Sequence, residues 1–96
     1  MPHDDDYFLR LAIQLAQQGR AAGADPFGAV LVGPDGVIAA QDFDRSVARS
    51  DPTAHAELAV ISAYCRAQHV FDLSGYTLYS SAEPCVMCSG AIHWAR

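Results

Sequence analysis

The first twenty residues place apolar and polar side chains at the spacing of an amphipathic helix. Aspartates occupy positions 4–6, where they can cap a helix and complement its dipole. The apolar residues that follow recur every three or four positions and form one stripe: Phe8, Leu11, Ala12, Leu15 and Ala16. Glycines at 19 and 23 mark the end of the pattern. We therefore expect a first helix with one buried face.

Three shorter apolar runs have the character of strands. The runs 29–32 and 37–40 flank the turn sequence Gly33-Pro34-Asp35-Gly36, which predicts an antiparallel hairpin. The run 76–80 alternates as a strand does and leads directly to Pro84. We expect these runs to form a sheet.

The stretch 54–65 is apolar on nearly every helical face, which predicts a helix covered on most sides. Asp51 can cap this helix, and Pro52 suits its first position. The expected order is helix, hairpin, helix, strand, helix. A right-handed crossover from the hairpin to the last strand would bring the starts of the second and third helices close together.

Composition and charge narrow the range of partners. The chain has 96 residues, a formal net charge of −5, no lysine and six scattered arginines. Binding to nucleic acid normally requires a basic patch, so this balance argues against it and favours a small neutral substrate. No run has the length of a transmembrane helix, and the start is acidic where a secretory signal is basic. We expect a single cytoplasmic domain without membrane contact.

Two short strings carry the candidate chemistry, His55-Ala56-Glu57 and Pro84-Cys85-Val86-Met87-Cys88. Catalytic zinc typically has three protein ligands and leaves its fourth position to water. One imidazole and two thiolates complete such a set. Glu57 then remains available for proton transfer. The strings therefore predict a zinc centre at which water is activated.

The expected helix starts suit this chemistry. The amides and the positive dipole end of a helix beginning at Pro84 favour thiolates at Cys85 and Cys88. Two thiolates weaken zinc as a Lewis acid, and a carboxylate beside the water compensates. Glu57 can take a proton from water and deliver it to a departing nitrogen. Residues two apart inside a helix point to opposite sides, so His55 and Glu57 can share a site only beyond the helix end.

The sequence around these strings extends the pattern over nearly the whole chain. The segments concerned are Pro26-Phe27-Gly28-Ala29-Val30, Asp51-Pro52-Thr53-Ala54-His55-Ala56-Glu57, Phe71-Asp72-Leu73-Ser74 and Glu83 to Arg96. In these segments the chain resembles the cytidine deaminase superfamily of zinc-dependent nucleobase and nucleoside deaminases, most of all its guanine deaminase branch. Adenosine deaminases of tRNA and fungal-type cytosine deaminases resemble parts of the same pattern.

The resemblance implies a fold and a set of site residues. The fold is α/β, a three-layer α/β/α cytidine deaminase-like arrangement of which this chain would hold the α-β-β-α-β-α portion. By position the zinc ligands are His55, Cys85 and Cys88, and the proton shuttle is Glu57. The remaining implied contacts with substrate are a backbone contact at Ala56 and the aromatic side chains of Phe27 and Trp94. These two aromatic residues can equally be core residues without a pocket role.

One position departs from the family pattern. Such enzymes usually carry a Gly-x-Asn turn whose Asn side chain binds the base, whereas this chain reads Gln41-Asp42-Phe43-Asp44. An amide offers a donor and an acceptor, but an ionised carboxylate only accepts. We expect Asp44 either to select a ring edge rich in N–H donors or to be protonated because Glu57 lies close by.

The length is a second departure, because relatives continue for several more elements. We expect residues 1–96 to form one deaminase domain that is incomplete at its C-terminus. The alternative is a minimal form that covers its sheet edge in a homodimer or larger homo-oligomer.

Three functions remain open. The first is deamination of a free purine such as guanine, which gives xanthine and ammonia. The second is a related activity on tRNA adenosine or on cytosine. The third is a zinc-binding domain without catalytic activity.

The cysteines also have other interpretations. The Cys-x-x-Cys pair alone can be a redox pair, but the His-x-Glu string favours zinc. Cys65 fits a small core residue.

Overall fold

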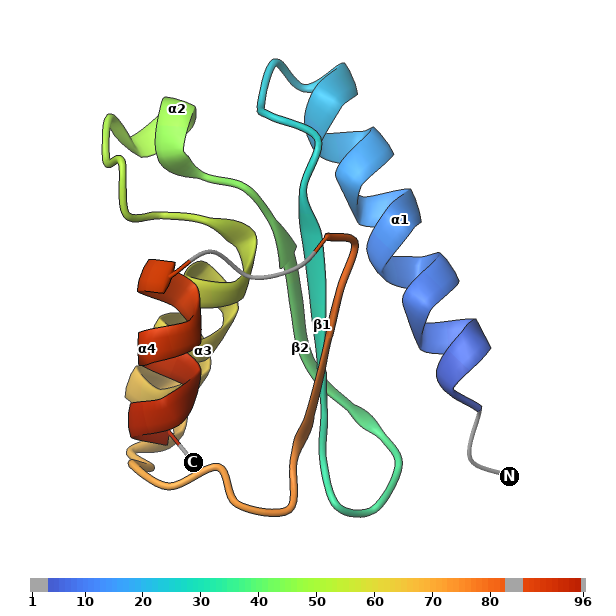
Figure 1. The fold of residues 1–96 in the computed structure, drawn as a ribbon, viewed down its shortest axis with the longest axis vertical. Helices are drawn as coiled ribbons and strands as arrows, with labels where there is room; N and C mark the ends of the chain where they lie inside the picture. Colours follow the sequence, from blue (N-terminus) through green and yellow to red (C-terminus); the bar gives the residue numbers. More distant parts are fainter. Residues whose placement is uncertain (1–3, 83–85, 96) are drawn as a thin grey trace.

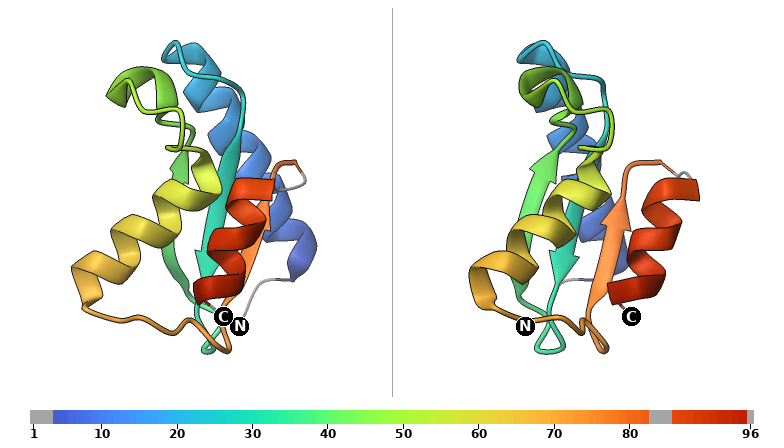
Figure 2. Two further views of the ribbon diagram at one scale, coloured as in Figure 1. Left: turned by 60° about the vertical axis from the view of Figure 1, so that its left-hand side comes forward. Right: turned by 90° about the vertical axis from the view of Figure 1, so that its left-hand side faces the viewer.

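The computed structural model describes residues 4–82 and 86–95, and within α4 it leaves the side chains at 86, 87, 89 and 94 undescribed. Its three strands form one sheet in the order β2-β1-β3, and β1 is antiparallel to both neighbours. Helix α1 covers one face of the sheet, and α3 and α4 cover the other (Figures 1 and 2). The expected three-layer α/β/α arrangement is confirmed, and none of the described helices is both long enough and apolar enough to cross a membrane.

Helix α1, Asp5–Ala21, begins as its sequence predicts. The side chain of Asp4 accepts a hydrogen bond of 3.0 Å from the backbone N–H of Tyr7, which is an N-cap. The predicted stripe faces the sheet, with the exception that Leu11 is only half-buried: its fully buried members are Phe8, Ala12, Leu15 and Ala16. Packing of the helix against the sheet is closest at Gly28, where a Cβ atom would lie 2.2 Å from the carbonyl oxygen of Ala12. This approach requires glycine.

Strand β1, Gly28–Val32, lies in the middle of the sheet and is buried along its whole length. Successive side chains of a strand point to opposite faces. Val30 and Val32 accordingly join the cluster beneath α1. Ala29 and Leu31 join the cluster beneath α3 and α4. The core therefore consists of two apolar layers, one on each face of the sheet, and β1 contributes side chains to both.

The predicted hairpin is confirmed, although its second strand is longer than expected. The turn closes with a hydrogen bond of 3.0 Å from the N–H of Gly36 to the carbonyl of Gly33, and Gly36 adopts a φ of 82°. Strand β2, Ile38–Phe43, pairs with β1 as far as Gly28. The additional pairing carries the chain to Asp44 at the end of the sheet opposite the hairpin turn.

The expected helix start at Pro52 is wrong, because residues 52 and 53 form a turn and the helix begins only at Ala56. The carboxylate of Asp51 accepts hydrogen bonds from the N–H and the hydroxyl of Thr53, so it caps a local turn and not a helix. Helix α3 runs over Ala56–Gln68, and a short helix α2, Ser46–Arg49, which the sequence analysis did not predict, precedes it. Only the first half of α3 is buried, so its expected coverage on most sides holds for that half alone.

Strand β3, Thr77–Ser80, pairs with β1, and helix α4 is described over Val86–Ala95. Because β2 and β3 are both antiparallel to β1, they run parallel to each other on either side of it. Helices α3 and α4 lie side by side and begin at the same end of the sheet (Figures 1 and 2). The predicted approach of the two helix starts is therefore observed.

Candidate functional site

His55 occupies the N-cap position of α3. Its backbone is extended, with φ −64° and ψ 157°, and its carbonyl accepts the first helical bond from Ala59 at 2.8 Å. His55 thus precedes the helical turn that holds Glu57. Side chains two positions apart point to opposite sides only inside a helix, so this rule does not apply to His55 and Glu57. The side chain of Glu57 is 5% exposed, so its carboxylate lies within the protein near the start of α3.

Cys88 lies in the first turns of α4 and is fully buried. Its Sγ atom is 3.7 Å from Nδ1 of His55, although the two residues are 33 positions apart. In a tetrahedral zinc centre, with bonds of about 2.3 Å to sulfur and about 2.0 Å to nitrogen, two such ligands lie about 3.6 Å apart. The observed separation and the pairing of imidazole with thiol both fit zinc.

The third predicted ligand, Cys85, lies outside the described residues. Within the described ranges 4–82 and 86–95, no group of three His, Cys, Asp or Glu side chains is placed to hold a metal ion. The structure therefore brings His55 and Cys88 together, and the ligand role of Cys85 stays a prediction. We call His55, Glu57, Cys88 and Asp44 together the helix-start site.

Asp44 belongs to this end of the molecule. It directly follows β2 and is 2% exposed. Its N–H donates to the carbonyl of Phe27 at 3.0 Å, and the N–H of the next residue donates to the carbonyl of Ala54 at 2.9 Å. These bonds attach residues 44 and 45 to the residue that precedes β1 and to the residue that precedes His55.

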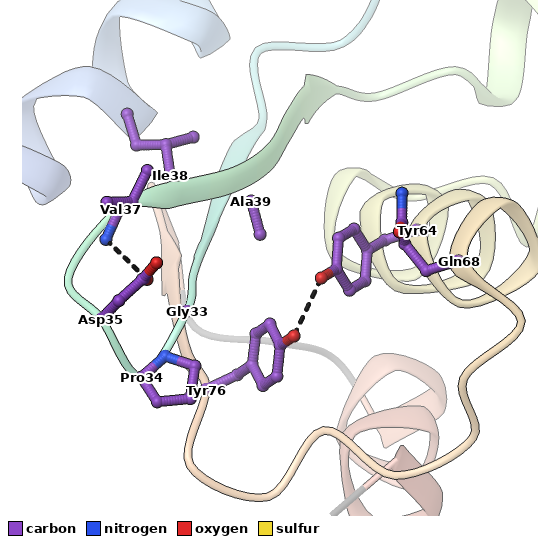
Figure 3. A pocket seen from close by; sticks show the side chains of 9 residues that line it. All are labelled: Gly33, Pro34, Asp35, Val37, Ile38, Ala39, Tyr64, Gln68 and Tyr76. Atoms are coloured by element: carbon purple, nitrogen blue, oxygen red, sulfur yellow. Dashed lines mark hydrogen bonds between the residues drawn. The ribbon is translucent and has the colours of Figure 1, made fainter.

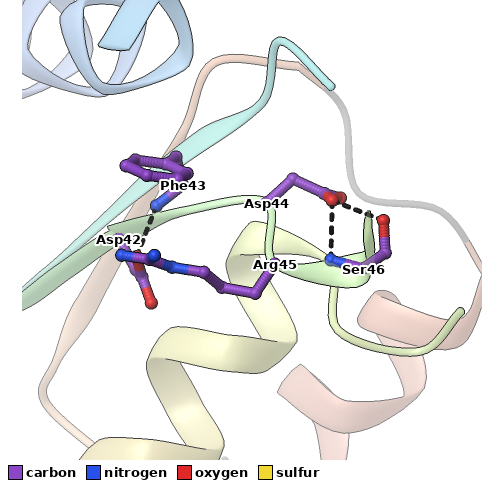
Figure 4. Close-up of polar contacts among 5 residues, drawn as sticks. All are labelled: Asp42, Phe43, Asp44, Arg45 and Ser46. Carbon is purple, nitrogen blue, oxygen red and sulfur yellow. Dashed lines mark hydrogen bonds and ion pairs between the residues drawn. The ribbon is translucent and has the colours of Figure 1, made fainter. Parts of the chain in front are cut away.

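The Asp44 side chain is held by a residue that the sequence analysis missed. Its Oδ1 atom accepts two hydrogen bonds from Ser46, one from the N–H at 2.9 Å and one from the hydroxyl at 2.5 Å (Figure 4). The signal for this contact was the Asp-x-Ser spacing, which is typical of a turn in which Asp accepts from the residue two positions on.

A second set of contacts braces the same segment. The Arg45 guanidinium lies 2.6 Å from the carboxylate of Asp42 and 4.0 Å above the ring of Phe43 (Figure 4). That ring lies so close to Gly19 that a Cβ atom there would be 2.8 Å from it. The backbone on either side of Asp44 is therefore fixed by side chains that lie outside the site.

The remaining predicted contact residues differ in their surroundings. Ala56 is fully buried in the core beneath α3. Phe27 is 42% exposed, so it is not a core residue. Trp94 lies in the last turn of α4, and its side chain is outside the description. The roles of these three residues in substrate binding stay predictions.

A hollow of about 460 Å³ lies elsewhere, beside the hairpin turn (Figure 3). We call it the hairpin-end cavity; its lining residues are Gly33, Pro34, Asp35, Val37, Ile38, Ala39, Tyr64, Gln68 and Tyr76. The hydroxyls of Tyr64 and Tyr76 are 2.8 Å apart, and this hydrogen bond raises the pKa of Tyr64, with burial adding to the effect. The lining contains no histidine or cysteine and one carboxylate, so it cannot provide the predicted zinc chemistry.

The comparisons with known proteins agree with the chemistry of the helix-start site. A family model described as the cytidine and deoxycytidylate deaminase zinc-binding region matches residues 2–96. A guanine deaminase of Bacillus subtilis is 47% identical over 90 residues, which are 93% of this chain and 57% of that protein. A tRNA-specific adenosine deaminase of Haemophilus influenzae is 39% identical over 92 residues, which are 96% of this chain and 53% of that protein.

Among solved structures, guanine deaminase from Bacillus subtilis superposes with a TM-score of 0.93 at 44% identity. The match covers 98% of this chain and 60% of that one. The chain thus spans a little more than half the length of the curated relatives that it matches.

Proposed function

Because the chain belongs to the cytidine and deoxycytidylate deaminase family, we propose that it is a zinc-dependent deaminase domain whose substrate is a free purine such as guanine. The observation that carries the chemistry is the separation of 3.7 Å between His55 Nδ1 and Cys88 Sγ. Glu57, in the first turn of the helix that His55 caps, is buried. The choice of guanine is supported by the 47% identity to a guanine deaminase.

The proposed roles follow from the positions of the donors. His55, Cys85 and Cys88 would hold zinc, which when bound lowers the pKa of water and makes it a nucleophile near neutral pH. Glu57 accepts a proton from the attacking water and returns it to the nitrogen of the leaving group. The water oxygen bonds to the amino-bearing carbon, the C–N bond breaks, and ammonia leaves.

The start of α3 suits the role of Glu57. Helix N-termini have amides without intrahelical partners and a positive dipole end, both of which stabilise negative charge. Glu57 lies in the first turn of α3. An acid–base residue at this place is buried with the site, where water is displaced when a substrate binds.

A small neutral substrate is also consistent with charge. The net charge is −5, and Arg45, one of six arginines, already pairs with Asp42. The arginines are scattered along the sequence, and RNA binding normally needs a cluster of basic side chains. The 39% identity to a tRNA-specific adenosine deaminase nevertheless makes RNA the second substrate to test.

We further propose that residues 1–96 form one domain of this kind that acts as a homodimer or larger homo-oligomer. Within the described chain, β3 pairs on one side only, and open sheet edges readily pair with another chain. Sedimentation equilibrium tests this proposal, and a monomer at micromolar concentration would contradict it.

The function is tested by ammonia release from guanine, cytosine and an RNA stem-loop containing adenosine. We expect release from guanine with one bound zinc per chain, and loss of release in a Glu57→Ala variant that keeps its zinc. Release from RNA alone would assign the tRNA activity. Zinc binding without turnover of any of the three substrates would indicate a silent domain.

A further inference from the structure

We propose that Ser46 is a positioning residue that fixes which atom of side chain 44 meets the ligand, and that Asp44 therefore selects a nucleobase edge with an N–H donor at that point. The nucleobase class of the ligand rests on the proposed function. The geometry of residues 44 and 46 does not.

Three observations place Asp44 at the end of the sheet where α3 begins, with its side chain buried. It follows the last residue of β2, at the end of the sheet where α3 begins (Figures 1 and 4). Its backbone N–H is bonded to Phe27, and the next backbone N–H is bonded to Ala54, the neighbour of His55. Its side chain is 2% exposed, so little more than one polar atom can be presented to a small ligand.

Ser46 directs both of its donors at one carboxylate oxygen. The N–H and the hydroxyl of Ser46 both donate to Oδ1. A hydroxyl and an amide N–H that donate to the same atom require that atom to be an acceptor. Both hydrogen bonds that the described residues give this side chain end on Oδ1, so Oδ2 is the oxygen left for a ligand.

The same two bonds determine what an amide would do at this position. In an Asp44→Asn variant only the carbonyl oxygen of the amide can accept from Ser46, so the NH₂ group must take the place of Oδ2. The ligand-facing atom thus changes from an acceptor to a donor. The group on the ligand that can bind this atom accordingly changes from an N–H donor to a lone pair. Without Ser46 the amide can turn over and present either group.

Two other turns in the chain have the same geometry and provide the contrast. The carboxylates of Asp51 and Asp72 accept both the N–H and the hydroxyl of the residue two positions on, Thr53 and Ser74. Both of these turns lie at the protein surface, whereas Asp44 is buried. A turn needs no burial to form. Burial of this one, braced by Arg45 and Asp42, indicates a role beyond local structure.

The experiment measures nucleobase affinity by titration calorimetry on the full zinc-loaded chain, in a Glu57→Ala background so that ligand is not consumed. The probes are guanine, 9-methylguanine, which lacks the N9–H, and 2-aminopurine, whose N1 is an acceptor where guanine has N1–H. With Asp44 present, we expect guanine to bind at least about tenfold more tightly than one of the two analogues.

The variants then separate positioning from a structural role. Asp44→Asn should reverse a preference over 2-aminopurine, whose N1 offers a lone pair to the amide, and should abolish a preference over 9-methylguanine, which has no lone pair at N9. Ser46→Ala combined with Asp44→Asn should bring guanine and 2-aminopurine to within about twofold, because the freed amide adapts to either edge. Ser46→Thr, which keeps both donors, should leave the wild-type order of ligands. The matched controls Asp72→Asn and Ser74→Ala should also leave that order, and circular dichroism checks that every variant is folded.

An order of ligands that is the same in the parent, in Asp44→Asn and in the double variant would overturn the inference while leaving the proposed function in place. The inference also fails if a folded Ser46→Thr variant loses the preference. Absence of binding by any purine to the parent chain overturns both.

Discussion

The two ends of the sheet differ in what they contain. The hairpin-end cavity has a volume of about 460 Å³, with two tyrosine hydroxyls and one carboxylate in its lining. At the helix-start site His55 and Cys88 lie 3.7 Å apart, and the side chains of Asp44 and Glu57 are buried at the same end of the sheet. The proposed site therefore rests on the residue types at one end of the sheet and not on the volume of a cavity.

The cause of the difference is the direction of the backbone at each end. Helices α3 and α4 begin at the site end, so their unpaired amides and positive dipole ends stabilise thiolate, carboxylate and other anions there. At the hairpin end, α3 terminates after Gln68 and exposes carbonyls. On the face of the sheet that α3 and α4 cover, the fold thus favours anionic chemistry at the site end, whereas α1 begins at the hairpin end on the opposite face (Figure 1).

The largest expected effect comes from removing a sulfur ligand. A Cys88→Ser variant should lose stoichiometric zinc and should unfold at a lower temperature than the zinc-loaded parent, because zinc binding contributes directly to folding free energy. Metal analysis and thermal unfolding measure both. Cys65→Ser is the matched control, since Cys65 lies in the second half of α3, and burial raises the pKa of its thiol. Zinc loss in the control, or full zinc content in Cys88→Ser, would contradict the site assignment.

The next effect tests the two ends directly. A Glu57→Gln variant should retain zinc and lose about 10²- to 10⁴-fold in kcat, the usual contribution of a general acid–base residue. At the other end, Tyr76→Phe removes the hydrogen bond to Tyr64 and should lower the urea midpoint while leaving kcat within about twofold. A comparable fall in kcat for Tyr76→Phe would mean that the cavity belongs to the active site.

A third prediction concerns the backbone contact that holds β1 against α1. A Gly28→Ala variant should be destabilised by about 2 kcal/mol or more, because the new Cβ would meet the Ala12 carbonyl oxygen at 2.2 Å. Urea unfolding measures the change. Gly90→Ala is the control: apart from its chain neighbours and its own helix backbone, no described atom lies within 4 Å of the new Cβ. Alanine there replaces glycine inside a helix, so a gain of about 0.5–1 kcal/mol is expected.

The smallest effect is a pH dependence outside both regions. The hydrogen bond from Tyr79 to Asp5 raises the pKa of Tyr79 to about 12. A raised folded-state pKa means that the stabilisation is complete below the unfolded pKa of about 10 and is lost as the pH rises from there through 12. Unfolding free energies between pH 8 and 12 should therefore fall more steeply for the parent than for Tyr79→Phe. Parallel curves would contradict the assignment.

Local patterns were enough to predict most of the elements. The Asp4 cap and the stripe after it specified α1, and the Gly-Pro-Asp-Gly turn specified the hairpin. Both predictions rest on interactions within a few residues. The prediction of where α3 starts failed because it also used only local patterns. Asp51 and Pro52 fit a helix start and a turn equally well, and the backbone hydrogen bond from Arg45 to Ala54 is a contact that no local pattern contains.

The sequence by itself determined the chemical identity of the candidate ligands, because imidazole, thiol and carboxylate are properties of residue types and their spacing is typical of one kind of zinc site. It also determined that Asp44 stands where the family usually has an amide. Only the tertiary structure decided that His55 and Cys88, 33 positions apart, approach within 3.7 Å, and that Ser46 bonds to a buried carboxylate. Those outcomes depend on how helices pack on a sheet, and packing is a property of the whole chain and not of any segment within it.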